Sequence, residues 1–405
     1  MVRVRGLGFG AAAVALAAAS CQVIAGGIGP RTYDEPTDGG NDAATDGGPP
    51  DSGPADTAHA DTAEAAVVCG ASAPPAPSSP QPPGNIAIIA AVRSVYYSAA
   101  DAPPGTTLAL GFDLDCVDTC PGPPSCASSQ KNCDADAGRD LAGNTFLSAV
   151  DNFASLAGGA SLNQLAAAGE FTILIQIESY NGLPDDNEIQ ASIFFSGGIL
   201  PYLGAGDDSG VDASTTVPPK WDGTDVWTVD PRVVAGYFVD DAGTYHYAPN
   251  LVATGYVADY AVVAKLPEIQ IGLGAGLLTF TNVVFVGNII PEATGAGGYG
   301  LEGQLAGRLS IPSILAAAGV FRDPLDPTRT KYLCGDDPTY LTFRNTLCQS
   351  ADIMSDPSRD RMGYPCDSLS ASLGLSASPA KLGAEHPALN ITVGCDGSPA
   401  VCGDD

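Results

Sequence analysis

The stretch EFTILIQIESYNGLPDDNEIQASIFFSG, residues 170–197, contains two apolar runs separated by a polar turn. The turn LPDDNE supplies Pro, Asp and Asn, residue types that end strands. In the first run every second residue is apolar, which places these side chains on one face of an extended strand: Phe171, Ile173, Ile175 and Ile177. The stretch therefore predicts two antiparallel strands joined by a short connection.

Similar short runs, rich in β-branched and aromatic residues, occur from about residue 107 to residue 310. Gly, Pro, Asp and Asn lie between them, a pattern typical of antiparallel all-β domains. Helical patterns are few and fall at residues 144–158, 311–319 and 338–353. We expect a mainly β protein, namely an antiparallel, jelly-roll-like β-sandwich with a few short helices and a cysteine-rich C-terminal cap.

Composition divides the chain into four parts. We expect a signal peptide over residues 1–20, a tether over 21–84, the β-sandwich body over 85–310 and the cysteine-rich cap, packed on the body, over 311–405. The tether is acidic and rich in Pro, Gly and Ala, without apolar periodicity. It buries too little surface to offset its ordering entropy, so we expect it to be disordered.

The N-terminus has the pattern of an export signal. Arg3 and Arg5 precede the uncharged run LGFGAAAVALAAAS, which is too short to span a membrane as a helix. The run ends at Cys21 and resembles the lipobox of bacterial lipoproteins, although Ala18 stands where Leu is usual. The resemblance implies lipidation of Cys21 and anchoring in a membrane. Because Gln22 follows instead of Asp, it implies the outer membrane, facing the periplasm or the cell surface. The alternative is an ordinary secretory signal.

The charge of the chain limits its partners. Acidic residues number 46 against 17 lysines and arginines, for a formal net charge of −29. Such a chain repels the phosphates of nucleic acids, so no nucleic-acid partner is expected.

The cysteines predict disulfides. Eleven cysteines are present, and ten remain if Cys21 carries lipid; an even number in an exported chain indicates disulfide pairing. Asp residues flank several of them and oppose the thiolate form that zinc binding and redox chemistry require. The ten form two groups of five, so complete pairing needs at least one bridge between the groups: Cys69, Cys116, Cys120, Cys126 and Cys133, then Cys334, Cys348, Cys366, Cys395 and Cys402.

One cysteine-rich stretch, residues 111–140, is also rich in aspartate. Its end reads D-x-D-x-G-x-D and resembles part of a calcium loop of the EF-hand or thrombospondin-repeat kind, although Ala137 stands where a third acidic ligand is expected. Carboxylates around a Gly turn can direct several oxygens at a hard cation. The alternative is a solvated acidic loop. The candidate Ca²⁺ ligands are Asp113, Asp115, Asp134, Asp136 and Asp140.

Both tryptophans of the chain lie in KWDGTDVWTVD, residues 220–230, beside aspartates. Aromatic rings stack on the apolar faces of sugars while carboxylates accept hydrogen bonds from the hydroxyls. The candidate glycan ligands are Trp221, Asp222, Asp225 and Trp227. The alternative is that the two indoles pack in the core.

The whole layout resembles that of bacterial cell-envelope lipoproteins, with a lipidated cysteine, an Asp/Gly/Pro tether and a cysteine-stapled β body. The body is similar in style to concanavalin-like jelly rolls, but the ExDxxE strand of the related glucanases is missing, which puts enzyme activity in doubt. We expect a binding or structural module, with a glycan or an envelope protein as partner. The alternative is a secreted hydrolase of extracellular polymer whose carboxylate pair the sequence does not identify.

Overall fold

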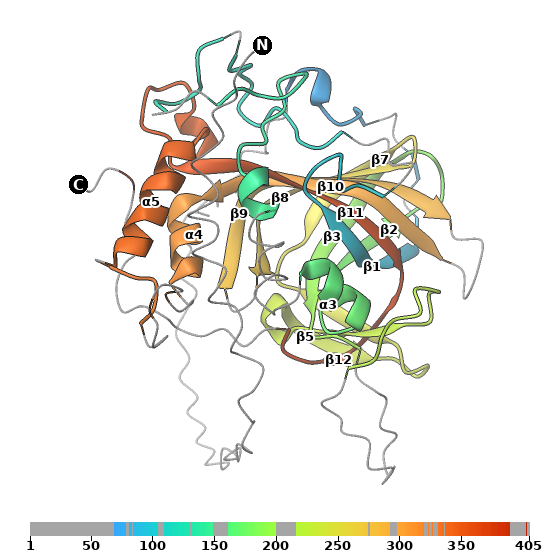
Figure 1. Cartoon of the computed structure of the whole chain (residues 1–405). Coiled ribbons are helices and arrows are strands. Elements are labelled where there is room, and N and C mark those ends of the chain that lie inside the picture. Colours follow the sequence, from blue (N-terminus) through green and yellow to red (C-terminus); the bar gives the residue numbers. More distant parts are fainter. Residues whose placement is uncertain are drawn as a thin grey trace, which may run out of the picture.

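Eight antiparallel strands form a closed barrel at the centre of the molecule, in the order β1-β11-β10-β9-β8-β7-β3-β2 (Figure 1). The computed structural model describes residues 69–77, 81–82, 84–103, 109–120, 122–128, 132–148, 161–199, 216–273, 276–291, 298–319, 323, 326, 331–335, 337–388 and 402. The barrel strands are β1 (Ile86–Tyr96), β2 (Thr172–Tyr180), β3 (Asp186–Ser196), β7 (Ala253–Ala258), β8 (Ala261–Leu273), β9 (Gly276–Pro291), β10 (Tyr299–Ser310) and β11 (Ser368–Pro379).

The expected jelly-roll-like sandwich is wrong. β1 pairs with β2 on one side, where Ile89 lies opposite Gln176, and with β11 on the other, where Ala91 lies opposite Ser378. β11 in turn pairs with β10 from Ser368 to Ala377, so the sheet closes on itself. A sandwich and a barrel need the same alternation of apolar and polar side chains along each strand. The alternation in the sequence therefore does not show whether the sheet closes into a barrel.

The closing strand lies in the segment expected to be a cap. β11 reads SLSASLGLSASP, in which Leu or Ala alternates mainly with Ser. The apolar side chains Leu369, Leu373 and Leu375 belong to the main core, and Ser370 and Ser372 face the other side, where they are also buried. The chain therefore returns to the barrel after residue 310, between β1 and β10.

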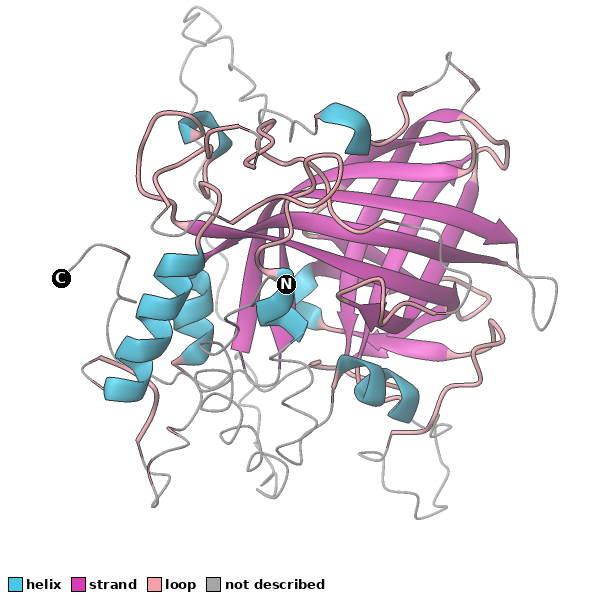
Figure 2. Cartoon of the chain, turned by 45° about the horizontal axis from the view of Figure 1, so that its top comes forward, coloured by secondary structure: helices cyan, strands magenta, loops and turns pink. Residues whose placement is uncertain are grey.

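The barrel interior is a packed apolar core. The predicted face of the 170–177 run is confirmed, because Phe171, Ile173, Ile175 and Ile177 all belong to the main core cluster. Each such side chain contributes about 1.5–3 kcal/mol when it leaves water. Figure 2 shows the barrel strands in magenta, with the helices lying outside them.

Two smaller apolar clusters cover the outer face of the barrel. In the first, Leu174 and Phe194 of the barrel meet Trp227 of β4 (Val226–Val229), which pairs in parallel with β12 (Lys381–Glu385). In the second, Phe112 and Leu114 pack on outward residues of β9 such as Val284. A separate hairpin, β5 (Val234–Val239) and β6 (Tyr245–Pro249), adjoins the first cluster.

The helices are short. Those named within the described residues are α3 (Leu162–Ala168), α4 (Ile311–Ala318), α5 (Pro338–Ser350) and the 3-10 turns η2 (Gly70–Ser72), η3 (Pro231–Val233) and η4 (Pro357–Arg359). Of the expected helix at 144–158, residues 144–148 are helical and the rest lies outside the described residues. α4 and α5 lie side by side at one side of the barrel (Figures 1 and 2). Among the described helices, none is long and apolar enough to cross a membrane.

Disulfides join distant parts of the chain. The prediction of a bridge between the two cysteine groups is confirmed by Cys126–Cys366, which spans 240 residues. Constraining so long a loop stabilises the fold by about 5 kcal/mol in the chain-entropy model. Cys334 is also disulfide-bonded, whereas Cys395, Cys21 and the tether up to residue 68 lie outside the described residues. The other described bridges are Cys69–Cys116, Cys120–Cys133 and Cys348–Cys402.

Candidate functional site

Three of the aspartates predicted as calcium ligands meet in the structure. Asp113, Asp115 and Asp140 each offer a carboxylate oxygen, and these oxygens lie within 4.8 Å of one another. All three residues are buried, with exposed fractions of 7%, 5% and 2%. Buried charged groups are rare unless they are paired or coordinate a metal, so the cluster marks a candidate metal centre.

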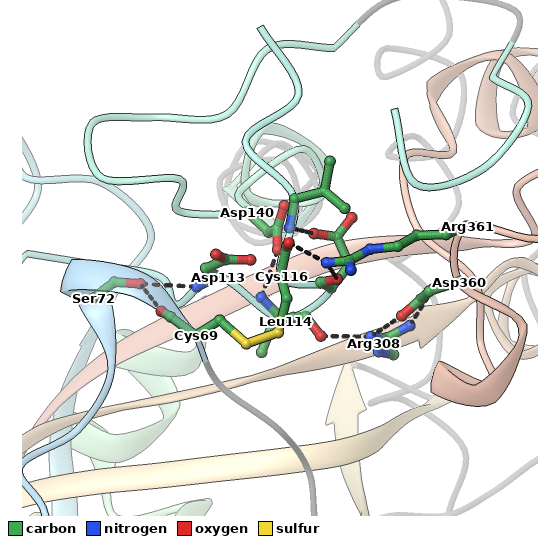
Figure 3. Close-up of a disulfide and its surroundings, with 11 residues drawn as sticks. Cys69, Ser72, Asp113, Leu114, Cys116, Asp140, Arg308, Asp360 and Arg361 are labelled. Atoms are coloured by element: carbon green, nitrogen blue, oxygen red, sulfur yellow. Dashed lines mark hydrogen bonds and ion pairs between the residues drawn. A yellow bond between two sulfur atoms is a disulfide. The ribbon is translucent and has the colours of Figure 1, made fainter. Parts of the chain in front are cut away.

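Local pairing brings the two ends of the stretch together. The Asp140 N–H donates to the Phe112 carbonyl at 3.0 Å, and the Asp140 carboxylate accepts from the Leu114 N–H at 2.6 Å. Asp113 pairs with Cys69 as an isolated antiparallel bridge, next to the Cys69–Cys116 disulfide. Figure 3 shows Asp113 and Asp140 close to each other beside this disulfide. The loop between them is closed again by the bridge from Cys120 to Cys133.

Burial and mutual repulsion change how these carboxyls ionise. Burial, together with the charges of Asp115 and Asp352, raises the pKa of Asp140 to about 10. Burial also raises the pKa of Asp115 to about 6 and raises that of Asp113. Without a cation, the centre therefore holds protons near neutral pH, and a bound cation would replace them.

The remaining two predicted ligands lie outside the cluster of three. Asp134 is half-buried, accepts a hydrogen bond from the Thr119 N–H at 2.6 Å and lies beside Asp140. Asp136 is exposed in the turn between Ala135 and Arg139. The D-x-D-x-G-x-D pattern thus supplies only its last aspartate to the centre, and the other two carboxylates come from the segment after Gly111.

Sequence reasoning missed Asp352. Its carboxylate accepts from the N–H and the hydroxyl of Ser370 on β11, at 2.9 and 2.5 Å. Burial raises its pKa to about 7, and the negative charges of Asp115 and Asp134 act in the same direction. More than 200 residues separate Asp352 from the acidic stretch, and no local pattern marks it.

The tryptophan set does not form one surface. Trp227 is fully buried, with its ring centre 5.6 Å from that of the half-buried Trp221. The buried Asp225 accepts hydrogen bonds from the N–H groups of Lys220 and Trp221, and thus holds the turn that precedes β4. Asp222 accepts from Thr224 within the same turn. In this structure Trp227 and Asp225 have packing and turn-forming roles and present no face to a ligand.

Exposed aromatic side chains lie instead on the β5–β6 hairpin. Phe238 is 63% exposed and stacks on His246 across the hairpin, with ring centres 4.7 Å apart and ring planes 11° apart. Tyr237 on the other face is 49% exposed. Asp240 lies 3.0 Å from the His246 ring nitrogen. The sequence signal was available, because GYFVDDAGTYHY places aromatic residues on both sides of a turn-forming DDAG.

Comparison of the chain with models of protein families, with curated proteins and with solved structures found no match.

Proposed function

We propose that this protein is an exported, lipid-anchored barrel module that binds a glycan of the cell envelope through the β5–β6 hairpin. The signal-like N-terminus and Cys21 support export and anchoring. The disulfides support an oxidising compartment, since such bridges persist outside the cytosol.

The exposed stack of Phe238 on His246 is the observation that carries the binding proposal. Burying a ring of this size is favourable, so leaving it exposed on a two-stranded hairpin favours a ligand that covers it. A sugar ring suits this surface, because its apolar face stacks on an aromatic ring while its hydroxyls donate to nearby carboxylates. Asp240 lies 3.0 Å from His246 of the stack, and the exposed Asp241 follows it in the chain, so these carboxylates are the candidate acceptors.

The charge of the surroundings narrows the class of glycan. The acidic residues Asp240, Asp241 and Glu385 lie on or next to the hairpin, and the whole chain carries a net charge of −29. An anionic polymer would be repelled, so the ligand class we propose is a neutral or amine-bearing glycan.

The hydrolase alternative receives less support. Glycoside hydrolases hold their two carboxyls about 5–9.5 Å apart across an open site. The three clustered carboxylates have oxygens within 4.8 Å of one another and are buried. This geometry suits a cation better than a sugar.

Binding is tested with the full-length protein, exported so that its disulfides form and held in mild detergent. It is mixed with insoluble neutral, amine-bearing and anionic polysaccharides and with cell-wall fractions, and the retained protein and released sugars are measured. We expect retention on a neutral or amine-bearing glycan, no released products, and at least about tenfold weaker retention for Phe238→Ala.

Val226→Ala is the matched control, because Val226 is 45% exposed on the neighbouring β4. It should leave retention unchanged. Equal retention of Phe238→Ala and the wild type would remove the hairpin as the site. If none of the polymers retains the protein, the remaining hypothesis is a structural role in the envelope without a glycan ligand. Release of small sugars would favour the hydrolase.

A further inference from the structure

Independently of glycan binding, we propose that Asp113, Asp115 and Asp140 together bind one calcium ion at the point where the tether joins the barrel. Calcium takes six to eight oxygen ligands at about 2.3–2.6 Å, so two ligands on opposite sides of one ion lie up to about 5 Å apart. The three carboxylate oxygens fall within this limit, at 4.8 Å or less. The three oxygens are therefore close enough together to share one ion.

The second observation is an unsatisfied atom. Asp113 is 93% buried, and its Oδ1 has no hydrogen-bond partner among the residues that the structure describes. Its other oxygen, Oδ2, faces Gly70 and Gly138, where an added Cβ would lie 3.4 and 3.5 Å away. A buried acceptor without a partner destabilises the fold, and it does so more strongly when it is charged. A cation among the three carboxylates would supply the missing partner.

Ion pairs among the described residues do not neutralise the centre. In the part of the chain that the structure describes, no Lys or Arg nitrogen forms an ion pair with these carboxylates. Arg361 lies nearby, but its guanidinium donates to the backbone carbonyls of Asp115 and Cys116 (Figure 3). Arg308 is paired with Asp360 at 2.7 Å. A divalent cation would offset two of the three carboxylate charges.

A cleft of about 1210 Å³ provides access. It lies between the outer face of β7 and β8 and the loops around residues 114–116 and 355–361, and its lining includes Asp115, Cys116 and Arg361. Asp115 thus belongs both to the wall of the cleft and to the carboxylate cluster. Water from the cleft can complete a coordination shell that three carboxylates leave open.

The donor set selects a hard ion. All three ligands are carboxylates, which suit calcium, whereas zinc and copper favour His or thiolate ligands. The nearest cysteine in sequence, Cys116, is in a disulfide and offers no thiolate. Magnesium is the competing hard ion, but it demands a regular octahedron with distances near 2.0–2.1 Å, so we expect the site to bind it more weakly.

The test uses the full-length protein in mild detergent, stripped with EDTA and dialysed. Calcium chloride and magnesium chloride are titrated separately by calorimetry, and bound metal is counted by mass spectrometry after equilibrium dialysis. We expect one calcium per chain and at least about tenfold weaker calcium binding in Asp113→Asn. The matched control is Asp136→Asn, which removes the same charge from the exposed part of the same loop and should change the dissociation constant less than about twofold.

The wild-type protein alone can overturn the proposal if Asp113→Asn does not fold. The proposal is wrong if the wild-type protein binds no calcium at millimolar concentration. It is also wrong if anomalous scattering places the bound ion away from these three carboxylates. Equal loss of binding in both variants would favour the sequence pattern D-x-D-x-G-x-D over the proposed centre. None of these readouts involves a glycan, so failure of the hairpin proposal would not affect them.

Discussion

At the scale of single residues, Asp140 shows how burial makes a common side chain unusual. The chain has 46 acidic residues, and side chains of this kind are mostly exposed to water in folded proteins. Asp140 is only 2% exposed, accepts from the Leu114 N–H and lies among other carboxylates. The sequence motif identified Asp140 as a candidate, but its neighbours Asp113 and Asp115 became its partners only through the Phe112–Asp140 backbone pairing.

These carboxyls predict an unusual pH dependence for the metal-free protein. Asp115 and Asp352 have pKa values raised by burial to about 6 and about 7, from 3.8. A carboxyl with a raised pKa in the folded state binds its proton more tightly when folded, so its contribution to stability is present below pH 3.8 and is lost as pH rises through the folded value. In EDTA we therefore expect the melting temperature to fall between pH 5 and pH 8.

Thermal unfolding at both pH values, in EDTA and in calcium, checks this prediction. Calcium should reduce the fall, because the ion replaces the protons that the centre loses. Burial by itself would raise the pKa of Asp230, but hydrogen bonds from Arg232 outweigh this effect and lower it. The stability that Asp230 contributes is therefore lost as the pH falls, and only at pH values below this range. A metal-free melting temperature that stays constant or rises from pH 5 to pH 8 would contradict the prediction.

At the scale of elements, β11 explains why closure was missed. Its alternating Ser and Leu match a strand, but Ser has no strong preference for strands, and five cysteines surround the segment. The tight seam between β1 and β11 depends on Gly374, which lies opposite Tyr96. A Cβ at Gly374 would overlap the Tyr96 ring.

Two strand glycines give a matched pair of variants. Gly374→Ala should destabilise the protein by about 1–3 kcal/mol, because the Tyr96 ring has to move within a packed seam. Gly236→Ala, in β5, has no atom within 4 Å of its added Cβ and should be neutral or slightly stabilising. Urea unfolding of both variants measures the difference. Equal stabilities would show that the seam is looser than the structure indicates.

At the scale of the whole molecule, the tether enters the body beside the carboxylate centre. Cys69 is the first described residue, and it joins Cys116 by a disulfide and Asp113 by a backbone bridge. Cys126–Cys366 then fastens the same loop to the segment before β11. The loop that carries the three clustered carboxylates is therefore fastened both to Cys69 and to the segment before β11.

The proposed lipid anchor is tested by Cys21→Ser. Removing the acceptor of the lipid should release the protein from membranes, because the acyl chains supply about 0.8 kcal/mol of membrane affinity per buried methylene group. Fractionation of cells into soluble and membrane material measures the release. Ser52→Ala, within the tether, serves as the control and should stay with the membranes. A Cys21→Ser variant that remains in the membrane fraction would contradict lipidation at this residue.

The sequence by itself determined the features that depend on composition and local periodicity. Alternation in residues 171–177 predicted an apolar strand face, and the odd count in each cysteine group predicted a bridge between the groups; both are confirmed. The density of Asp in residues 111–140 singled out the stretch that contains the three clustered carboxylates. These inferences hold because a strand repeats every two residues and a disulfide needs two cysteines, whatever the fold.

Only the tertiary structure decided closure and the membership of the sites. Side chains alternate every two residues in a sandwich and in a barrel alike. Only the observed pairing of β11 with both β1 and β10 shows that the sheet is closed. Tertiary packing buried Trp227, left Phe238 exposed and brought Asp113 and Asp115 to Asp140 while Asp136 faces solvent. The physical reason is that burial and separation in space depend on contacts between residues far apart in the chain, which local patterns do not encode.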